Sequence, residues 1–206
     1  MNRLEVLLSL LPNCNVLADV GCDHGYLSKY ALDKNLCKRV IISDISAKSL
    51  QKAITLLKPY GDRVKSYVCD GLTAYENQAD FAVIAGMGGE EICLILKGVK
   101  TLPNGLLLAP QKNNDKVRRL LIELGYKITK DFTFCDGKFY DVIKAEKGVD
   151  SYTEKEFIFG RDNLKDRPTD FIEKLKKEEK LLLEVVKNDI KVKPKLDLIR
   201  EVLNEN

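Results

Sequence analysis

The chain has 206 residues, with 34 Lys and Arg against 31 Asp and Glu, so its formal net charge is +3. This length allows one α/β domain of about 150 residues and a smaller appendage. The charge is too small to indicate a nucleic-acid partner by itself, and the longest apolar runs, such as 106–109, are too short to cross a bilayer. Because residues 1–11 lack a signal-peptide core and cleavage site, we expect a cytoplasmic protein with no membrane partner.

Apolar strands alternate with amphipathic helices over residues 1–148, which is typical of a parallel sheet with helices on both faces. We predict strands at 16–20, 39–44, 64–69, 80–86, 104–110, 126–134 and 139–146. The predicted helices are 2–11, 25–34, 46–58, 88–99 and 113–124, with Ser46 and either Asn113 or Asn114 as N-caps. The last two strands are expected to form a β-hairpin that turns at Asp136 and Gly137.

The pattern changes after Lys147. Residues 151–168 are polar and mixed, and two charged amphipathic helices follow, one of about five turns from Thr169 and one over 195–203, joined by a turn that contains Pro194. This predicts a second domain, 149–206, that forms an antiparallel coiled-coil hairpin. It is expected either as a solvated hairpin or as an arm that holds a large substrate.

The six cysteines do not form a C-x-x-C pair, and the chain has one histidine. A zinc site is therefore not expected, and no metal is predicted. We expect the cysteines to behave as small core residues in a reducing compartment.

Residues 16–27 (VLADVGCDHGYL) combine a short apolar strand, a glycine-containing turn and the start of a helix. This order is typical of a nucleotide-binding loop, because glycines such as Gly21 and Gly25 let the backbone approach a ligand closely. The G-x-G-x-x-G fingerprint of dinucleotide sites is absent, and Asp23 would repel a pyrophosphate. Asp19 and Asp23 therefore favour S-adenosylmethionine (SAM), whose sulfonium is cationic, over NAD.

Acidic residues end the next two strands. Asp44 lies 23 residues after Gly21, a spacing at which a carboxylate accepts hydrogen bonds from ribose hydroxyls; the alternative is that it caps the next helix. Asp70 and Gly71 end the third strand, where they are expected to meet the adenine or to form a simple turn.

The loops after the fourth and fifth strands are the candidate substrate sites. Gly86, Met87, Gly88 and Gly89 offer backbone groups and room for a flat base, or form a tight turn that packs a helix on the sheet. After the fifth strand, Gln111 and Asn113 are candidates for base-edge contacts and Lys112 for a phosphate, with a polar helix cap as the alternative.

Two aromatic side chains complete the candidates. His24 lies inside the nucleotide loop and is predicted to contact the methionine end of the cofactor or the target base, or to play a structural role. Tyr140 in the last strand is predicted to stack on a base, with core packing as the alternative. Asp23, His24 and Tyr140 are the predicted catalytic residues.

Five motifs together resemble the bacterial tRNA (adenine-22-N1)-methyltransferases: residues 19–27 (DVGCDHGYL), 70–72 (DGL), 84–89 (IAGMGG), 109–113 (APQKN) and 138–143 (KFYDVI). The resemblance covers 1–148 by motif and the C-terminal helices only by architecture. Cys22 stands where Ser or Thr is expected and Gly25 where Ala is common, but both are small. The resemblance implies a class I methyltransferase fold, with a Rossmann-like seven-stranded sheet, that methylates N1 of adenine 22 in the D-loop region of tRNA.

We therefore predict two sets of contacts. The cofactor, SAM, is expected to contact Asp19, Gly21, Cys22, Asp23, Gly25, Asp44, Ile45, Asp70, Gly71 and Gly86. The tRNA partner is expected to contact Met87, Gly88, Gly89, Gln111, Lys112 and Asn113.

The chemistry expected of such a site is mainly alignment, because adenine N1 is already nucleophilic and the methyl group of SAM is already activated. Asp23 is expected to stabilise the charge that adenine gains, and the base must leave its stack to expose N1. The alternatives are a SAM-dependent enzyme acting on a different RNA, a protein or a small molecule, and a non-catalytic nucleotide-binding module. The oligomeric state stays open.

Overall fold

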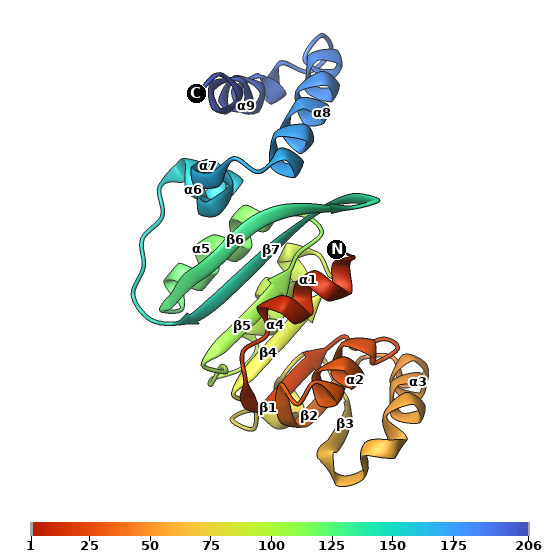
Figure 1. The fold of residues 1–206 in the computed structure, drawn as a ribbon. Coiled ribbons are helices and arrows are strands. Elements are labelled where there is room, and N and C mark those ends of the chain that lie inside the picture. Colours follow the sequence, from red (N-terminus) through yellow and green to blue (C-terminus); the bar gives the residue numbers. More distant parts are fainter. Residues whose placement is uncertain (1, 206) are drawn as a thin grey trace.

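A computed structural model, which describes residues 2–205, places the seven predicted strands in one sheet (Figure 1). The strand order is β3-β2-β1-β4-β5-β7-β6; β1 to β5 are parallel to one another, and β7 is antiparallel to both β5 and β6. The strands are β1 (Cys14–Val20), β2 (Cys37–Asp44), β3 (Val64–Val68), β4 (Phe81–Ala85), β5 (Gly105–Ala109), β6 (Tyr126–Asp136) and β7 (Lys138–Lys147). The chain builds outward from β1 to β3 and then returns to β4, so the strand order reverses between β1 and β4, where open α/β sheets bind ligands.

Helices cover both faces of the sheet, as the alternating pattern predicts. Helices α1 (Arg3–Leu10), α2 (Tyr26–Asp33) and α3 (Ala47–Leu57) share one core cluster with residues such as Leu17 and Ile42. Helices α4 (Gly89–Lys97) and α5 (Asn114–Glu123) share the other with residues such as Ile84 and Leu106. Three short 3-10 helices, Lys58–Arg63, Thr73–Tyr75 and Ile190–Val192, connect the larger elements.

The capping predictions have different outcomes. The Ser46 side chain accepts a hydrogen bond from the Ser49 N–H and caps α3, as predicted. Asn113 occupies the N-cap position of α5, but its backbone is left-handed (φ 55°) and its side chain caps nothing. The Asn114 side chain points instead to the Asp141 carboxylate of β7. The prediction that an asparagine side chain caps α5 is therefore wrong, because the side chain of Asn114 is held by the neighbouring strand.

The β6–β7 hairpin turns where expected. Asp136 pairs with Lys138 across Gly137, which has φ +70°. Only glycine adopts such a backbone without strain, so the sequence pair Asp136–Gly137 defines the turn.

Residues 151–168, which the sequence analysis left without helices, form α6 (Glu154–Phe159) and α7 (Arg161–Asp166). The Thr153 and Glu156 side chains form a capping box at the start of α6. The capping box can be recognised in the sequence, but helices of six residues are too short to show a clear amphipathic period.

Helices α8 (Thr169–Val185) and α9 (Lys193–Asn204) follow and pack against each other; Figure 1 shows α8 from the side and α9 end-on, and the antiparallel coiled-coil geometry stays a prediction. Ion pairs join Glu178 to Lys195 and Glu179 to Arg200, while Phe171, Leu175, Ile199 and Val202 form a small core with Phe159 of α6. Pro194 lies in the first turn of α9, where a missing N–H is tolerated, and not in the connection, which corrects the predicted break. The domain boundary at residue 148 stays a prediction.

Candidate cofactor site

A cavity of about 390 Å³ opens at the carboxyl ends of the central strands. It joins residues that are far apart in the sequence: Gly21 and Asp23 after β1, Asp44 and Ile45 after β2, Asp70 and Gly71 after β3, Gly86 and Met87 after β4, and Gln111 after β5. Each of these residues was a sequence-based candidate. The cavity lies at the point where the strand order reverses, which is the expected place for a ligand.

The loop after β1 turns sharply through three residues with positive φ: Gly21 (+67°), Asp23 (+46°) and Gly25 (+75°). Its start is fixed by the Gly21 N–H, which donates to the Ser43 carbonyl of β2 at 2.8 Å. A Cβ on Gly25 would lie 2.9 Å from the Cβ of Ala53, so α2 and α3 approach too closely for a side chain there. Gly25 therefore serves the packing that shapes the loop, and it does not line the cavity.

The Asp44 carboxylate holds the turn before α3 and faces the cavity. Its Oδ1 accepts from the Ser46 N–H at 2.8 Å, and its Oδ2 lies 3.4 Å from the Asp23 N–H. The alternative that Asp44 caps the next helix is wrong, because Ser46 caps α3; the Asp44 carboxylate instead stiffens the loop and keeps lone pairs on the cavity wall.

Hydrogen bonds from Ser43 of β2 hold the loop after β3. The Ser43 hydroxyl bonds the Tyr75 hydroxyl at 2.6 Å and donates to the Gly71 carbonyl at 3.2 Å. Gly71 has φ +61°, and a Cβ there would come within 2.5 Å of Ile95. Asp70 therefore projects from a fixed turn at the edge of the cavity.

The loops after β4 and β5 clasp one another. The Gln111 side-chain amide donates to the Gly86 carbonyl at 2.7 Å, and the Gln111 N–H donates to the Met87 carbonyl at 2.9 Å. The Gly89 N–H donates to the Lys112 carbonyl at 2.8 Å, and a Cβ on Gly89 would collide with the carbonyls of Lys112 and Asn113. Gly89 is needed for this clasp, and neither Gly88 nor Gly89 lines the cavity.

Four other candidates lie away from the cavity wall. Asp19 is buried, its carboxylate accepts from the Ser28 hydroxyl at 2.7 Å, and burial raises its pKa to about 6. Burial also raises the pKa of the Cys22 thiol to about 12, so this cysteine stays neutral. The His24 ring is half-exposed and stacks on Tyr26 at a centroid distance of 5.8 Å.

Tyr140 of β7 is the fourth candidate that lies away from the cavity wall. Its ring stacks on Phe134 at 5.5 Å, and the guanidinium carbon of Arg3 lies 5.2 Å from its centroid. Arg3 itself lines the cavity, so Tyr140 borders the site through one intervening side chain.

Lys112 and Asn113 line a second cavity of about 610 Å³. Its other walls come from β7 and from the C-terminal helices, including Phe139, Lys174 and Lys195. The substrate candidates are therefore divided: Met87 lines the first cavity, Lys112 and Asn113 line the second, and Gln111 lines both.

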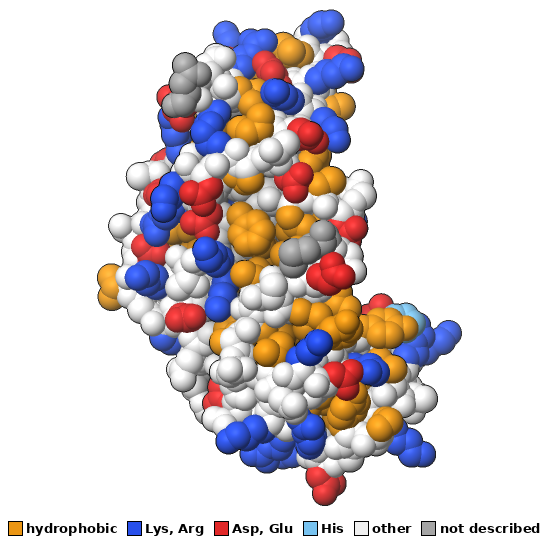
Figure 2. Space-filling model, viewed as in Figure 1, with side chains coloured by type: hydrophobic (Ala, Val, Ile, Leu, Met, Phe, Trp, Pro, Cys, Tyr) orange, Lys and Arg blue, Asp and Glu red, His pale blue; other side chains and the backbone are white. Residues whose placement is uncertain are grey.

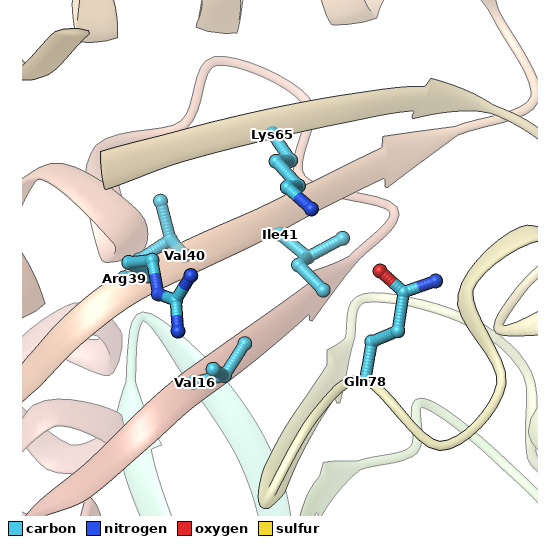
Figure 3. A pocket seen from close by; sticks show the side chains of 6 residues that line it. All are labelled: Val16, Arg39, Val40, Ile41, Lys65 and Gln78. Carbon is cyan, nitrogen blue, oxygen red and sulfur yellow. The ribbon is translucent and has the colours of Figure 1, made fainter. Parts of the chain in front are cut away.

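A third cavity, of about 220 Å³, is lined by Val16, Arg39, Val40, Ile41, Lys65 and Gln78 (Figure 3). It lies near the beginnings of β1 to β3, at the opposite strand ends from the first cavity, and contains none of the candidate residues. Its location excludes it from the site built by the strand-end loops.

Six residues on the wall of the first cavity were not candidates from the sequence: Arg3, Val20, Cys69, Ala85, Glu91 and Ile95. Val20, Cys69 and Ala85 adjoin the candidate loops, and Glu91 and Ile95 lie in α4, but Arg3 comes from a helix with no motif. Among residues 2–205, no group of three or more His, Cys, Asp or Glu side chains has a metal-binding arrangement, and no helix is long and apolar enough to span a membrane.

The strand order, the glycine loop and the acids at successive strand ends define a methyltransferase-type site. Residues 1–143 match the protein family described as Methyltransferase domain, and the chain belongs to this family. The predicted class I methyltransferase fold is thereby confirmed.

Individual proteins similar to this chain are tRNA methyltransferases by name. The tRNA (adenine(22)-N(1))-methyltransferase of Bacillus subtilis (strain 168) is 32% identical over 155 residues, which cover 71% of this chain and 64% of that enzyme. The crystal structure of Streptococcus pneumoniae Sp1610, assigned as a tRNA (m1A22) methyltransferase and solved with S-adenosyl-L-methionine, superposes with a TM-score of 0.91 at 28% identity, covering 99% of this chain and 100% of that one. The crystal structure of the B. subtilis M1A22 tRNA methyltransferase matches with a TM-score of 0.89 over 98% of this chain and 97% of that one, at 24% identity, which shows the shared fold.

Proposed function

We propose that this protein transfers the methyl group of SAM to N1 of adenine 22 in tRNA. The observation that carries the proposal is the convergence of Gly21, Asp44, Asp70 and Gly86 on one cavity at four adjacent strand ends. The similarity to the B. subtilis and S. pneumoniae proteins supplies the substrate.

Successive strand ends of the cavity can hold successive parts of SAM. Adjacent strands lie about 4.8 Å apart, so the β3, β2, β1 and β4 ends offer an extended track of about 14 Å. Asp70 and Gly71 would hold the adenine, Asp44 the ribose hydroxyls, and the loop of Gly21 and Asp23 the sulfonium region, which leaves the methionine end for β4.

The charge of the cavity favours the same ligand. Asp23, Asp44, Asp70 and Glu91 line it, and carboxylates at such density repel the pyrophosphate of a dinucleotide while attracting the sulfonium and ammonium groups of SAM. When bound, SAM supplies a methyl group activated by its sulfonium charge. The residues of the chain then need only to orient the two reactants and exclude water.

Of the candidate catalytic residues, Asp23 lines the cavity, and His24 and Tyr140 lie outside its wall. The Asp23 side chain is 67% exposed, so its carboxylate is free to face a base that gains positive charge on methylation. His24 lies next to it, and Tyr140 borders the cavity through Arg3. We assign to Tyr140 the stacking of the extruded adenine and to His24 a contact with the same base.

The second cavity is the proposed tRNA-binding cleft. Lys112, Lys174 and Lys195 contribute cations to its walls, which lie between the loop after β5 and the C-terminal helices, and Asp115, Asp141 and Glu178 contribute carboxylates. Lys174 pairs with Asp141 and Lys195 with Glu178, so we assign the phosphate contact to Lys112. Figure 2 shows Lys and Arg side chains spread over these helices at the top of the view, with acidic side chains among them. We propose that the region beyond residue 148 forms a separate tRNA-holding unit and that the enzyme acts in the cytoplasm.

The test is methyl transfer from labelled SAM to an unmodified tRNA transcript, followed by mass spectrometry of the nucleosides. We expect 1-methyladenosine with the native transcript and none when A22 is replaced by G. An Asp23→Asn variant should bind SAM but transfer more slowly, because the carboxylate opposite the developing charge is gone. SAM binding by calorimetry without any 1-methyladenosine would overturn the substrate assignment.

A further inference from the structure

Arg3 is the only basic residue among the described residues that line the cofactor cavity. Four carboxylates, those of Asp23, Asp44, Asp70 and Glu91, line the same space. A single cation on an acidic wall marks the place where an anionic group of the ligand is favoured.

One backbone contact and two side-chain contacts place the Arg3 guanidinium near the β4 end of the cavity. The Arg3 N–H donates to the Asp136 carboxylate at 2.8 Å, which ties the start of α1 to the β6–β7 hairpin. The guanidinium carbon lies 5.2 Å from the centroid of the Tyr140 ring, within the range of a cation–π interaction. Its Nη2 lies 3.2 Å from the position that a Cβ would take on Gly86.

The guanidinium has no carboxylate partner within residues 2–205. Its Nε is buried and makes no hydrogen bond there, in contrast to Arg118, whose buried guanidinium is paired with Asp131. A buried donor without a partner is destabilising by about 1–3 kcal/mol, so the arrangement of Arg3 suits a group that arrives with the ligand.

We propose that Arg3 binds the carboxylate of the methionine moiety of SAM. The inference rests on the proposed function, because it takes the cavity to be the SAM site. With adenine at β3 and ribose at β2, the methionine end reaches β4, where Gly86 and Arg3 lie. The carboxylate is the only anionic group of SAM, and guanidinium binds carboxylates through charge-assisted and often bidentate hydrogen bonds.

The experiment compares ligands with and without that carboxylate. Arg3→Met keeps the backbone bond to Asp136, and Arg39→Met is the matched control, because Arg39 lines the cavity at the opposite strand ends (Figure 3). Calorimetry is done without tRNA, using SAM, S-adenosylhomocysteine and decarboxylated SAM, after thermal unfolding confirms that both variants fold. Arg3→Met should raise the Kd of the first two ligands about 10- to 100-fold and that of decarboxylated SAM less than about twofold. Arg39→Met should change none of the three.

Two outcomes would overturn the inference while leaving the proposed function intact. Equal weakening of all three ligands would mean that Arg3 shapes the cavity without contacting the carboxylate. Unchanged SAM affinity with a raised KM for tRNA would assign Arg3 to a phosphate of the substrate. If the wild-type protein failed to bind SAM at all, the proposed function would fall together with the inference.

Discussion

Replacing Arg118 with methionine is expected to weaken the attachment of the C-terminal helices to the sheet. The Arg118 side chain on α5 is fully buried; its Nε donates to Asp131 of β6 at 2.8 Å and its Nη2 to the same carboxylate at 2.8 Å. Its Nη1 donates to the carbonyl of Phe157 in α6 at 3.1 Å. One guanidinium therefore joins three elements, and methionine fills similar volume without the charge.

The expected loss follows from the carboxylate that remains. Removing one partner of a buried ion pair is destabilising by about 3–5 kcal/mol, because the other charge stays buried without compensation. Domains have free energies of unfolding of about 5–15 kcal/mol, so the loss is a large fraction of the total. For a chain of this size it corresponds to a fall in Tm of about 6–20 °C.

Urea unfolding followed by circular dichroism measures this loss, and the neighbouring Arg119 provides the matched control. Arg119 pairs with Glu154 at 2.6 Å, but its side chain is 42% exposed, so Arg119→Met should be destabilising by less than about 1 kcal/mol. Adding Asp131→Leu to Arg118→Met should recover part of the loss, since the unpaired charge is then removed.

The variant should also show a characteristic pH dependence. Burial and the neighbouring Asp141 raise the pKa of Asp131 even with Arg118 in place, and loss of the guanidinium removes an opposing effect, so the folded variant binds a proton that the unfolded chain releases. Its stability should therefore rise as the pH falls towards the pKa of the unfolded carboxyl. The reasoning is refuted if Arg118→Met is no more destabilising than Arg119→Met at neutral pH.

Three further variants test single contacts. Burial raises the pKa of Asp19 to about 6, so protonation of Asp19 stabilises the fold fully below the unfolded pKa, and this stabilisation is lost as the pH rises through 6. In denaturant unfolding, Asp19→Asn should therefore make the free energy of unfolding less dependent on pH. At pH 8 it should raise that free energy by about 1–3 kcal/mol. Asp44→Ala should raise the Kd of SAM at least about tenfold in calorimetry, and an unchanged Kd would remove Asp44 from the cofactor site. Gly89→Ala should slow methyl transfer to tRNA with little change in SAM affinity, because the new Cβ presses on the Lys112 and Asn113 carbonyls; equal loss of both functions would contradict this.

The strand-end candidates were predictable because local pattern and topology act together. A parallel sheet brings the carboxyl ends of its strands to one edge, so recognising where β1 to β5 end was enough to gather Gly21, Asp44, Asp70, Gly86 and Gln111. The observed strand boundaries lie within two residues of the predicted ones, since each strand is a short apolar run bounded by turn residues.

Arg3 was not predictable in the same way. Its position in the cavity depends on the packing of α1 beside the β6–β7 hairpin, and the bond from its N–H to Asp136 spans 133 residues of sequence. Asp19 shows the opposite case: the motif made it a cofactor candidate, but its carboxylate turns inward to Ser28. Which side of a loop a side chain faces is decided by tertiary contacts that a periodicity does not contain.

The two cavities share a wall, and this gives the proposed reaction its geometry. Gln111 lines both cavities and donates to the Gly86 carbonyl at 2.7 Å, while Lys112 and Asn113 line the cavity beside the C-terminal helices. A tRNA held by those helices would therefore extrude its adenine across residues 111–113 to reach the methyl group. Because the same segment is clasped to Gly89, any change that loosens the clasp should separate the reactants before it affects the affinity for either one.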